Sequence, residues 1–187
     1  DLTVTGVQTC ALPISNMKAK KLDNKQGNAI VKACDKILAG KYKDQFVVDM
    51  INSGAGTAFN MNANEVIANI SLKILGKKLG QYQYLHPNDH VNMSQSSNDT
   101  YPTAMHLSVL FALDDLAPII KKLEVSLDKK SKQFKKYKKI GRTHLMDALP
   151  VTLGSEFQAY SASVRYARLK IESVYESLYR IALGGTA

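Results

Sequence analysis

Apolar residues recur at helical spacing along most of the chain. A first stripe begins after Asp23 and ends before Gly40, with members at Ile30, Ala33, Cys34, Ile37 and Leu38. A second stripe ends near Gly76 or Gly80, with members at Val66, Ile67, Ile70, Ile74 and Leu75. Because a period of about 3.6 residues places such positions on one face of a helix, the pattern predicts two helices of moderate length.

Two longer apolar stripes occupy the second half of the chain. The first contains Leu107, Leu110, Phe111, Ile119, Ile120, Leu123 and Leu127. Pro118 interrupts it, so a kink or a brief break is expected near Ala117. The second runs from about Glu156 to Leu183, and strand-like alternation is almost absent. The predicted fold is all-α, with a small N-terminal helical domain followed by the first long helices of an antiparallel helical bundle.

The predicted organisation has three parts. Residues 1–15 show no helical or strand period and resemble the translation of a sequencing adapter, so we expect a non-native leader there. Residues 16–98 form the expected N-terminal domain, and residues 99–187 begin the bundle. A final helix of the predicted length would project beyond a small globule, so part of its apolar face is expected to pack against other subunits or further sequence.

Charge and cysteine content narrow the class of protein. The 187 residues carry a formal net charge of +9, and nine lysines lie between Lys121 and Lys139. These lysines could belong to a nucleic-acid-binding module, because lysines neutralise phosphates. Charge runs of this kind usually belong to a solvated helix end, however, so no nucleic-acid partner is expected. No stretch approaches the roughly 20 uncharged apolar residues that span a bilayer, so no membrane role is expected. Only Cys10 and Cys34 occur, which favours a reducing compartment and a cytoplasmic location.

Three loops rich in small polar residues each precede a predicted helix. The first four N–H groups of a helix lack partners within it and lie at the positive end of its dipole, so such loops are typical sites for a carboxylate or phosphate. The first loop, residues 54–65, offers the Thr57 hydroxyl. If this loop is only structural, Asn60 or Asn62 is the expected helix cap.

The second loop, residues 86–102, is the richest in polar groups. Pro102 suits the first turn of a helix capped by Asp99 or Thr100. Just ahead of that helix would then lie Ser96, Ser97 and Asn98. Neutral donors in this position can bind an anion.

The same loop holds two histidines four residues apart, His86 and His90. On a helix this spacing would suit zinc, but Pro87 makes a helix improbable there, so no metal site and no cofactor are expected. His90 is expected to be hydrogen-bonded within the loop, and His86 to help hold an acid group.

The third loop, residues 141–157, contains Thr143 and His144. Imidazole titrates near neutral pH, so His144 is the candidate for proton transfer, and Thr143 can position a ligand oxygen. The alternative is a buried His144 that is hydrogen-bonded to Asp147.

Taken together, the three loops resemble the fumarase/aspartase superfamily. The matching patterns are GxGT…NMNxNE at residues 54–65, HPNDxVNxSQSxND at residues 86–99 and GRTxxxDAxP at residues 141–150. The resemblance covers essentially residues 23–187. It implies a lyase that hydrates fumarate to malate reversibly, by anti addition and elimination through an aci-carboxylate intermediate, in a homotetramer of the tricarboxylic acid cycle.

The resemblance also implies roles for particular residues. The positions that match the family's dicarboxylate site are Thr57, Ser96, Ser97, Asn98, Thr143 and His144, and His144 would also assist the leaving group. A secondary dicarboxylate site in fumarases corresponds to His86, Asn88 and Asp89. The family's catalytic base is a serine in the pattern GSSxMPxKxN, which does not occur in this chain. The chain alone is therefore expected to be inactive.

The motifs leave two substrates open, malate and aspartate, because both are converted to fumarate by the same type of elimination. Ser96-Ser97-Asn98-Asp99 and residues 183–187 are similar to fumarases, which favours hydration of fumarate. Ala55 and the Asn62–Glu65 segment are closer to aspartases, so the alternative is an aspartate ammonia-lyase.

Overall fold

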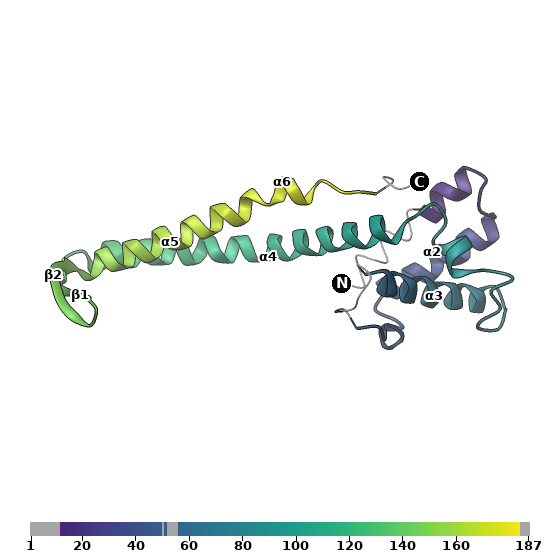
Figure 1. Cartoon of the computed structure of the whole chain (residues 1–187), viewed down its shortest axis with the longest axis horizontal. Helices are drawn as coiled ribbons and strands as arrows, with labels where there is room; N and C mark the ends of the chain where they lie inside the picture. The colour runs from purple at the N-terminus through teal and green to yellow at the C-terminus, as the bar shows by residue number, and fades with distance from the viewer. Residues whose placement is uncertain (1–11, 50, 52–55, 184–187) are drawn as a thin grey trace. The chain divides into compact units, whose positions relative to one another are not determined.

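The computed structural model describes residues 12–49, 51 and 56–183. The chain divides into two compact units, one containing the described residues up to Ser108 together with those from Arg180 onward, and the other running from Val109 to Tyr179. Both are mainly helical, which confirms the predicted fold class (Figure 1). The boundaries predicted at residues 15 and 98 stay predictions.

Helix α2, Asn24–Leu38, begins and ends close to where the sequence predicts. The carboxylate of Asp23 accepts hydrogen bonds from the N–H groups of Lys25 and Gln26, which satisfies two of the donors that a helix N-terminus leaves free. The helix ends at Ala39, and Gly40 follows with a φ of +80°, a conformation that glycine adopts without a steric penalty.

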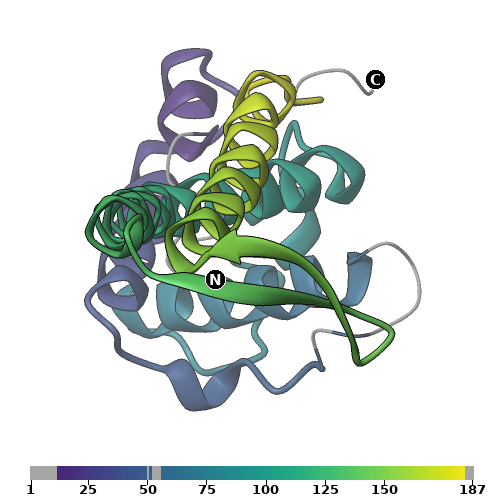
Figure 2. The ribbon, with the colours of Figure 1, turned by 90° about the vertical axis from the view of Figure 1, so that its left-hand side faces the viewer.

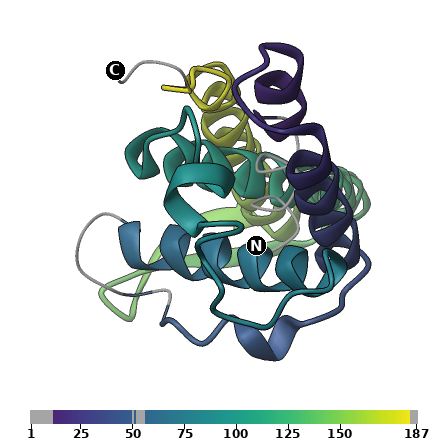
Figure 3. The same ribbon diagram turned by 90° about the vertical axis from the view of Figure 1, so that its right-hand side faces the viewer.

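Helix α3, Thr57–Ile74, packs against α2 to form the core of the first unit (Figures 1 and 3). The core side chains include Ile30, Ala33, Cys34, Ile67 and Leu72, all essentially buried. The predicted caps Asn60 and Asn62 are wrong, because the helix starts earlier, at Thr57, and its N-cap is Gly56, whose φ is +85°. Both asparagines therefore lie inside the first turns, where they are buried.

Two short turns connect these helices to the polar loops of the same unit. The 3₁₀ turn η1, Lys43–Gln45, precedes α3, and the π-helical turn η2, Pro87–Val91, packs against α3. Residues 12–18 are also helical, although residues 1–15 show no helical period in the sequence. Their nature as a non-native leader stays a prediction.

Helix α4, Ser97–Phe134, continues through Pro118 without interruption. The brief break expected near Ala117 is therefore wrong. Proline removes one N–H donor and crowds the preceding turn, but the bonds of the neighbouring turns are enough to carry the helix across it. The predicted last helix is also shifted and divided, since α5 spans Leu153–Ser173 and α6 spans Tyr175–Leu178.

Within the second unit, α4 and α5 run antiparallel in direct contact. A Cβ atom on Gly154 would lie 2.5 Å from the carbonyl oxygen of Ser131, so the absence of a side chain permits this close approach. Farther along, the Ser161 hydroxyl donates to the Glu124 carbonyl oxygen at 3.2 Å. The Arg168 guanidinium donates to the Glu124 carboxylate at 2.8 Å.

The Glu124 carboxylate is expected to make the stability of this helix pair depend on pH. Hydrogen bonds from Arg168 and Lys121 hold the pKa of Glu124 below its ordinary value of 4.5. The ionised Glu124 therefore stabilises the α4–α5 pair fully above pH 4.5. This stabilisation is lost as the pH falls through the lower pKa that Glu124 has in the folded state. The difference in urea midpoint between the wild type and Glu124→Gln should shrink on acidification. Glu176→Gln, at an exposed position of α6, is the control, and an equal pH dependence of both differences would contradict the assignment.

The connection between α4 and α5 is an antiparallel hairpin that the sequence did not predict. Strand β1, Lys138–Thr143, pairs with β2, Met146–Thr152, and β2 leads directly into α5 (Figure 2). Nearly all of its side chains are exposed. Strands with both faces exposed need no alternation of apolar and polar residues, which explains the missing signal.

One described helix, α4, is long and apolar enough by length and composition to cross a membrane when up to two charged residues are admitted. The adjacent Asp114 and Asp115 lie within its apolar stretch. An aspartate at the centre of a spanning helix costs about 2.5–3.5 kcal/mol, so this pair disfavours insertion.

Candidate active site

Thr57 is the first residue of α3 and is exposed. The preceding Gly56 is buried, and a Cβ atom placed on it would overlap the ring of Tyr101. The positive φ of Gly56 and its contact with the Tyr101 ring therefore fix where α3 begins. This geometry sets the position of the Thr57 hydroxyl.

Helix α4 begins at Ser97, with Ser96 immediately ahead of it. The Ser96 hydroxyl accepts from the N–H of Asn98 at 3.2 Å, and its carbonyl oxygen accepts from the N–H of Thr100 at 3.0 Å. The predicted caps Asp99 and Thr100 are therefore wrong. Both are buried in the first turn, where the Thr100 hydroxyl lies 3.0 Å from both Gln95 Oε1 and Ser96 O.

The first unit brings Thr57 and Ser97 together. Their hydroxyl oxygens lie 3.4 Å apart, although 40 residues separate them in the sequence. Each is the first residue of its helix, so the N-termini of α3 and α4 meet at this point. Two helix N-termini with hydroxyl donors form an environment that stabilises negative charge.

His86, Asn88 and Asp89 lie at the turn η2. The turn contradicts the expectation that Pro87 prevents helical structure, because proline is compatible with the first position of a helical turn. His86 Nδ1 accepts from the N–H groups of Asn88 and Asp89 at 3.2 and 3.3 Å. Asn88 and Asp89 are exposed, and their binding role stays a prediction.

His90 has the structural role that the sequence suggested. Its Nδ1 atom accepts from the backbone N–H of His86 at 2.9 Å. Among the described residues, no group of three or more His, Cys, Asp or Glu side chains is arranged to hold a metal ion.

Thr143 and His144 lie at the tip of the hairpin in the second unit. Thr143 pairs with Met146, which leaves His144 and Leu145 as a two-residue turn. Both have positive φ, +47° and +63°, which is typical of a type I′ turn. His144 is exposed, so the alternative of a buried histidine is wrong.

Leu145 is an unusual residue for this turn, because type I′ turns favour Asn-Gly or Asp-Gly. Left-handed backbone costs a non-glycine residue about 1–2 kcal/mol, whereas glycine adds about 0.5–1 kcal/mol of unfolded-state entropy. Leu145→Gly is therefore expected to stabilise the hairpin by about 0.5–1 kcal/mol, measured by urea unfolding. Leu149→Gly is the control at an exposed strand position, and it should destabilise. Destabilisation by both variants would argue against strain at Leu145.

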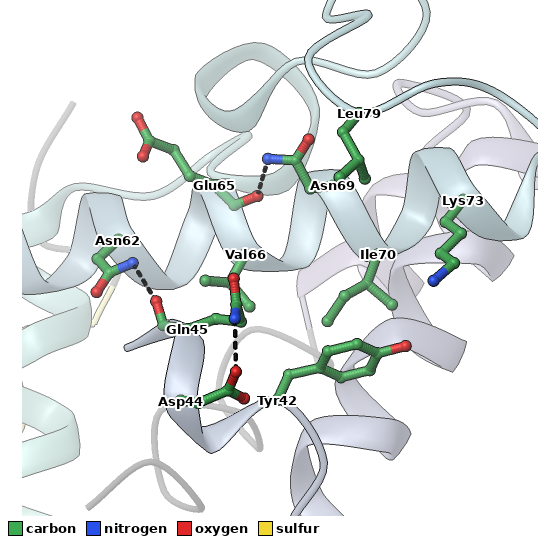
Figure 4. Close-up of a pocket in the computed structure, with 10 residues that line it drawn as sticks. All are labelled: Tyr42, Asp44, Gln45, Asn62, Glu65, Val66, Asn69, Ile70, Lys73 and Leu79. Atoms are coloured by element: carbon green, nitrogen blue, oxygen red, sulfur yellow. Dashed lines mark hydrogen bonds between the residues drawn. The ribbon is translucent and has the colours of Figure 1, made fainter. Parts of the chain in front are cut away.

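A pocket of the first unit lies away from every predicted site residue, and nothing in the sequence predicts it. It has a volume of about 530 Å³ and lies between η1, α3 and the following loop (Figure 4). Asn62 donates to the Gln45 carbonyl oxygen, and Asn69 donates to the Glu65 carbonyl oxygen. These amides already have protein partners, so they hold the walls of the pocket in place.

Comparison with known proteins identifies the family. A family model described as "Lyase" matches residues 2–187. The chain is 48% identical over 177 residues to an aspartate ammonia-lyase of Bacillus subtilis, covering 95% of this chain and 37% of the relative. It is 49% identical over 167 residues to the human mitochondrial fumarate hydratase, covering 89% of this chain and 33% of the relative.

Solved structures agree with this result. A fumarate lyase:delta crystallin structure from Brucella melitensis matches with a TM-score of 0.87 and 43% identity, covering 98% of this chain and 43% of that one. A class II fumarase from Schistosoma mansoni matches with a TM-score of 0.82 and 35% identity, covering 100% of this chain and 39% of that one. The chain therefore belongs to the fumarase/aspartase superfamily of lyases. It spans about two-fifths or less of the length of the curated relatives it matches.

Proposed function

We propose that this chain forms the dicarboxylate-binding part of a lyase that hydrates fumarate to malate reversibly. The observation that supports it most is the 3.4 Å approach of the Thr57 and Ser97 hydroxyls at two helix N-termini. Neutral donors at this position stabilise a carboxylate through hydrogen bonds and helix dipoles, without the cost of desolvating a cationic side chain. Ser96 and Asn98 add further polar groups at the same helix start.

The proposed reaction is an anti elimination and its reverse. A base removes the proton from the carbon next to one carboxylate of malate, and the electron pair moves into that carboxylate as an aci-carboxylate. The carbon–oxygen bond then breaks, and the leaving hydroxyl takes up a proton and departs as water. Donors placed around the developing charge lower the barrier because they are already oriented.

His144 and Thr143 are assigned the leaving-group side of this reaction. An exposed imidazole at a hairpin tip is accessible to a ligand, and histidine is the commonest general acid in enzymes. The pattern that carries the family's base serine does not occur in this chain, so the proposed base lies in another part of the protein. The turn at His86, Asn88 and Asp89 is assigned to a second dicarboxylate.

The proposed assembly is a homotetramer in which several subunits complete each site. Large apolar side chains remain exposed on α4 and α5, among them Phe111, Ile119, Leu123, Tyr166 and Leu169. Exposed apolar surface on long helices is typical of faces that pack against other helices.

An aspartate ammonia-lyase is the second candidate, because both classes of relative match at similar identity. The Asn62–Glu65 segment and Ala55 favour it, whereas the Ser96-Ser97-Asn98-Asp99 segment favours hydration. The two activities share the anti elimination and differ in whether water or ammonia leaves.

The product of the whole gene should be assayed with fumarate in the presence and absence of ammonia. Malate formation without ammonia is the expected result, and it is measured as the loss of fumarate absorbance. Formation of aspartate with no malate would reject the hydratase in favour of the ammonia-lyase. Absence of both products would reject the proposed function.

A further inference from the structure

Buried asparagines connect the start of α3 to the loop that carries Ser96. Asn92 Oδ1 accepts from Asn60 Nδ2 at 3.1 Å and from Asn64 Nδ2 at 3.0 Å. Asn60 and Asn64 are 3% and 2% exposed and lie one turn apart on the same face of α3. Both donors therefore converge on a single oxygen.

The NH2 group of the Asn92 side chain bonds to Gln95, the residue before Ser96. Asn92 Nδ2 donates to the carbonyl oxygen of Gln95 at 3.1 Å. Gln95 Oε1 in turn accepts from the Thr100 hydroxyl at 3.0 Å. A chain of hydrogen bonds thus runs from α3 through Asn92 to both sides of the α4 N-terminus.

Asn16 holds the same loop from a different segment. Its Nδ2 donates to the Met93 carbonyl oxygen, and its Oδ1 accepts from the Ser94 hydroxyl, both at 3.0 Å. Asn16 is 6% exposed. Ser94 has a φ of +64°, a conformation that a serine keeps only when its surroundings impose it.

From this geometry we infer that Asn16, Asn60, Asn64 and Asn92, which we call the asparagine clamp, are positioning residues for the anion site. Bonds of Asn60, Asn64 and Asn92 connect the start of α3 to the residue before Ser96, and Asn16 holds the intervening loop at Met93 and Ser94. The clamp therefore fixes Ser96–Asn98 relative to Thr57. The inference deepens the proposed function and rests on it. Opening this network would leave the buried amides of Asn60 and Asn64 without their shared acceptor, which is costly in a region of low dielectric, so the network resists displacement.

The test compares Asn92→Ala with Asn69→Ala in the full chain. Asn69 is a matched control, because it is also an amide that holds a loop, accepting from the Gly80 N–H and donating to the Tyr82 hydroxyl. Its bonds lie at the far end of α3, beside the pocket in Figure 4. Both variants should lose stability, which urea unfolding measures.

Two readouts separate positioning from stability. Succinate, a non-reacting dicarboxylate, is titrated while the amide signals of Ser97–Thr100 are followed by NMR, and hydrogen exchange of the same amides is measured without ligand. Asn92→Ala should weaken succinate binding about tenfold, equivalent to about 1.4 kcal/mol. It should also speed exchange at Asn98–Thr100 about tenfold, whereas Asn69→Ala should change neither.

Equal effects of the two variants on both readouts would overturn the clamp. If the wild-type chain shows no succinate response, the proposal that this chain binds the dicarboxylate fails, and the exchange rates then decide the clamp alone. Unchanged exchange at Asn98–Thr100 in Asn92→Ala would reject it.

Discussion

Gly56→Ala is expected to lower the free energy of unfolding of the chain by about 1–4.5 kcal/mol, the sum of two penalties less the roughly 0.5–1 kcal/mol of unfolded-state entropy that glycine carries. Gly56 has a φ of +85°, which costs a residue with a Cβ atom about 1–2 kcal/mol. The added methyl would also overlap the Tyr101 ring, and overpacking of this kind costs about 1–3 kcal/mol. Urea unfolding followed by circular dichroism measures the sum.

Two controls separate the backbone cost from the cost of the overlap with the Tyr101 ring. Gly76 has a φ of +71° with no atom within 4 Å of an added Cβ, so Gly76→Ala should show the backbone term alone. In a Tyr101→Ala background the ring is gone, and Gly56→Ala should then cost about as much as Gly76→Ala. A full penalty in that background would contradict the assigned overlap.

The same substitution tests the proposed function. Thr57 follows Gly56 directly, so a displaced helix start should move its hydroxyl away from Ser97. Succinate binding by Gly56→Ala should therefore be weaker than binding by Gly76→Ala under conditions where both variants are folded.

His144→Asn is expected to lower kcat of the intact enzyme at least about a hundredfold, or about 2.7 kcal/mol in activation free energy. Asparagine keeps the polarity of the turn and tolerates positive φ, so the hairpin should persist. It cannot transfer a proton, however, and the leaving hydroxyl would depart without acid assistance. Initial rates of fumarate hydration and malate dehydration measure the loss.

His106→Asn provides the matched control, since His106 lies in α4 outside the three motifs. Its kcat should stay within about twofold of the wild type, a change that corresponds to less than 1 kcal/mol. A kcat for His144→Asn as high as that of His106→Asn would remove His144 from the reaction.

Sequence patterns predicted the helices better than they predicted the helix starts. Asp23 and Gly40 mark the ends of α2 correctly, because a side-chain cap and a left-handed glycine act locally. The sequence predicts the start of α4 about three residues too late. Pro102 is compatible with a first turn, but the hydrogen bonds of Ser96 extend the helix back toward the loop.

The hairpin shows a second limit of the sequence. Its strands are exposed on both faces, so no hydrophobic alternation marks them. The sequence also does not predict the positive φ values of His144 and Leu145, because type I′ turns usually contain a glycine and this turn has none. Pairing across the hairpin therefore imposes the turn on residues that do not prefer it.

The sequence by itself determined the helical periods, the three polar loops and the family to which they belong, because these depend on local spacing and residue type. Only the tertiary structure decided that Thr57 and Ser97 meet and that Asn92 connects their helices. Those contacts join residues 28 to 40 positions apart, and the packing of the unit brings their partners together. Local sequence preferences carry no information about such long-range pairing.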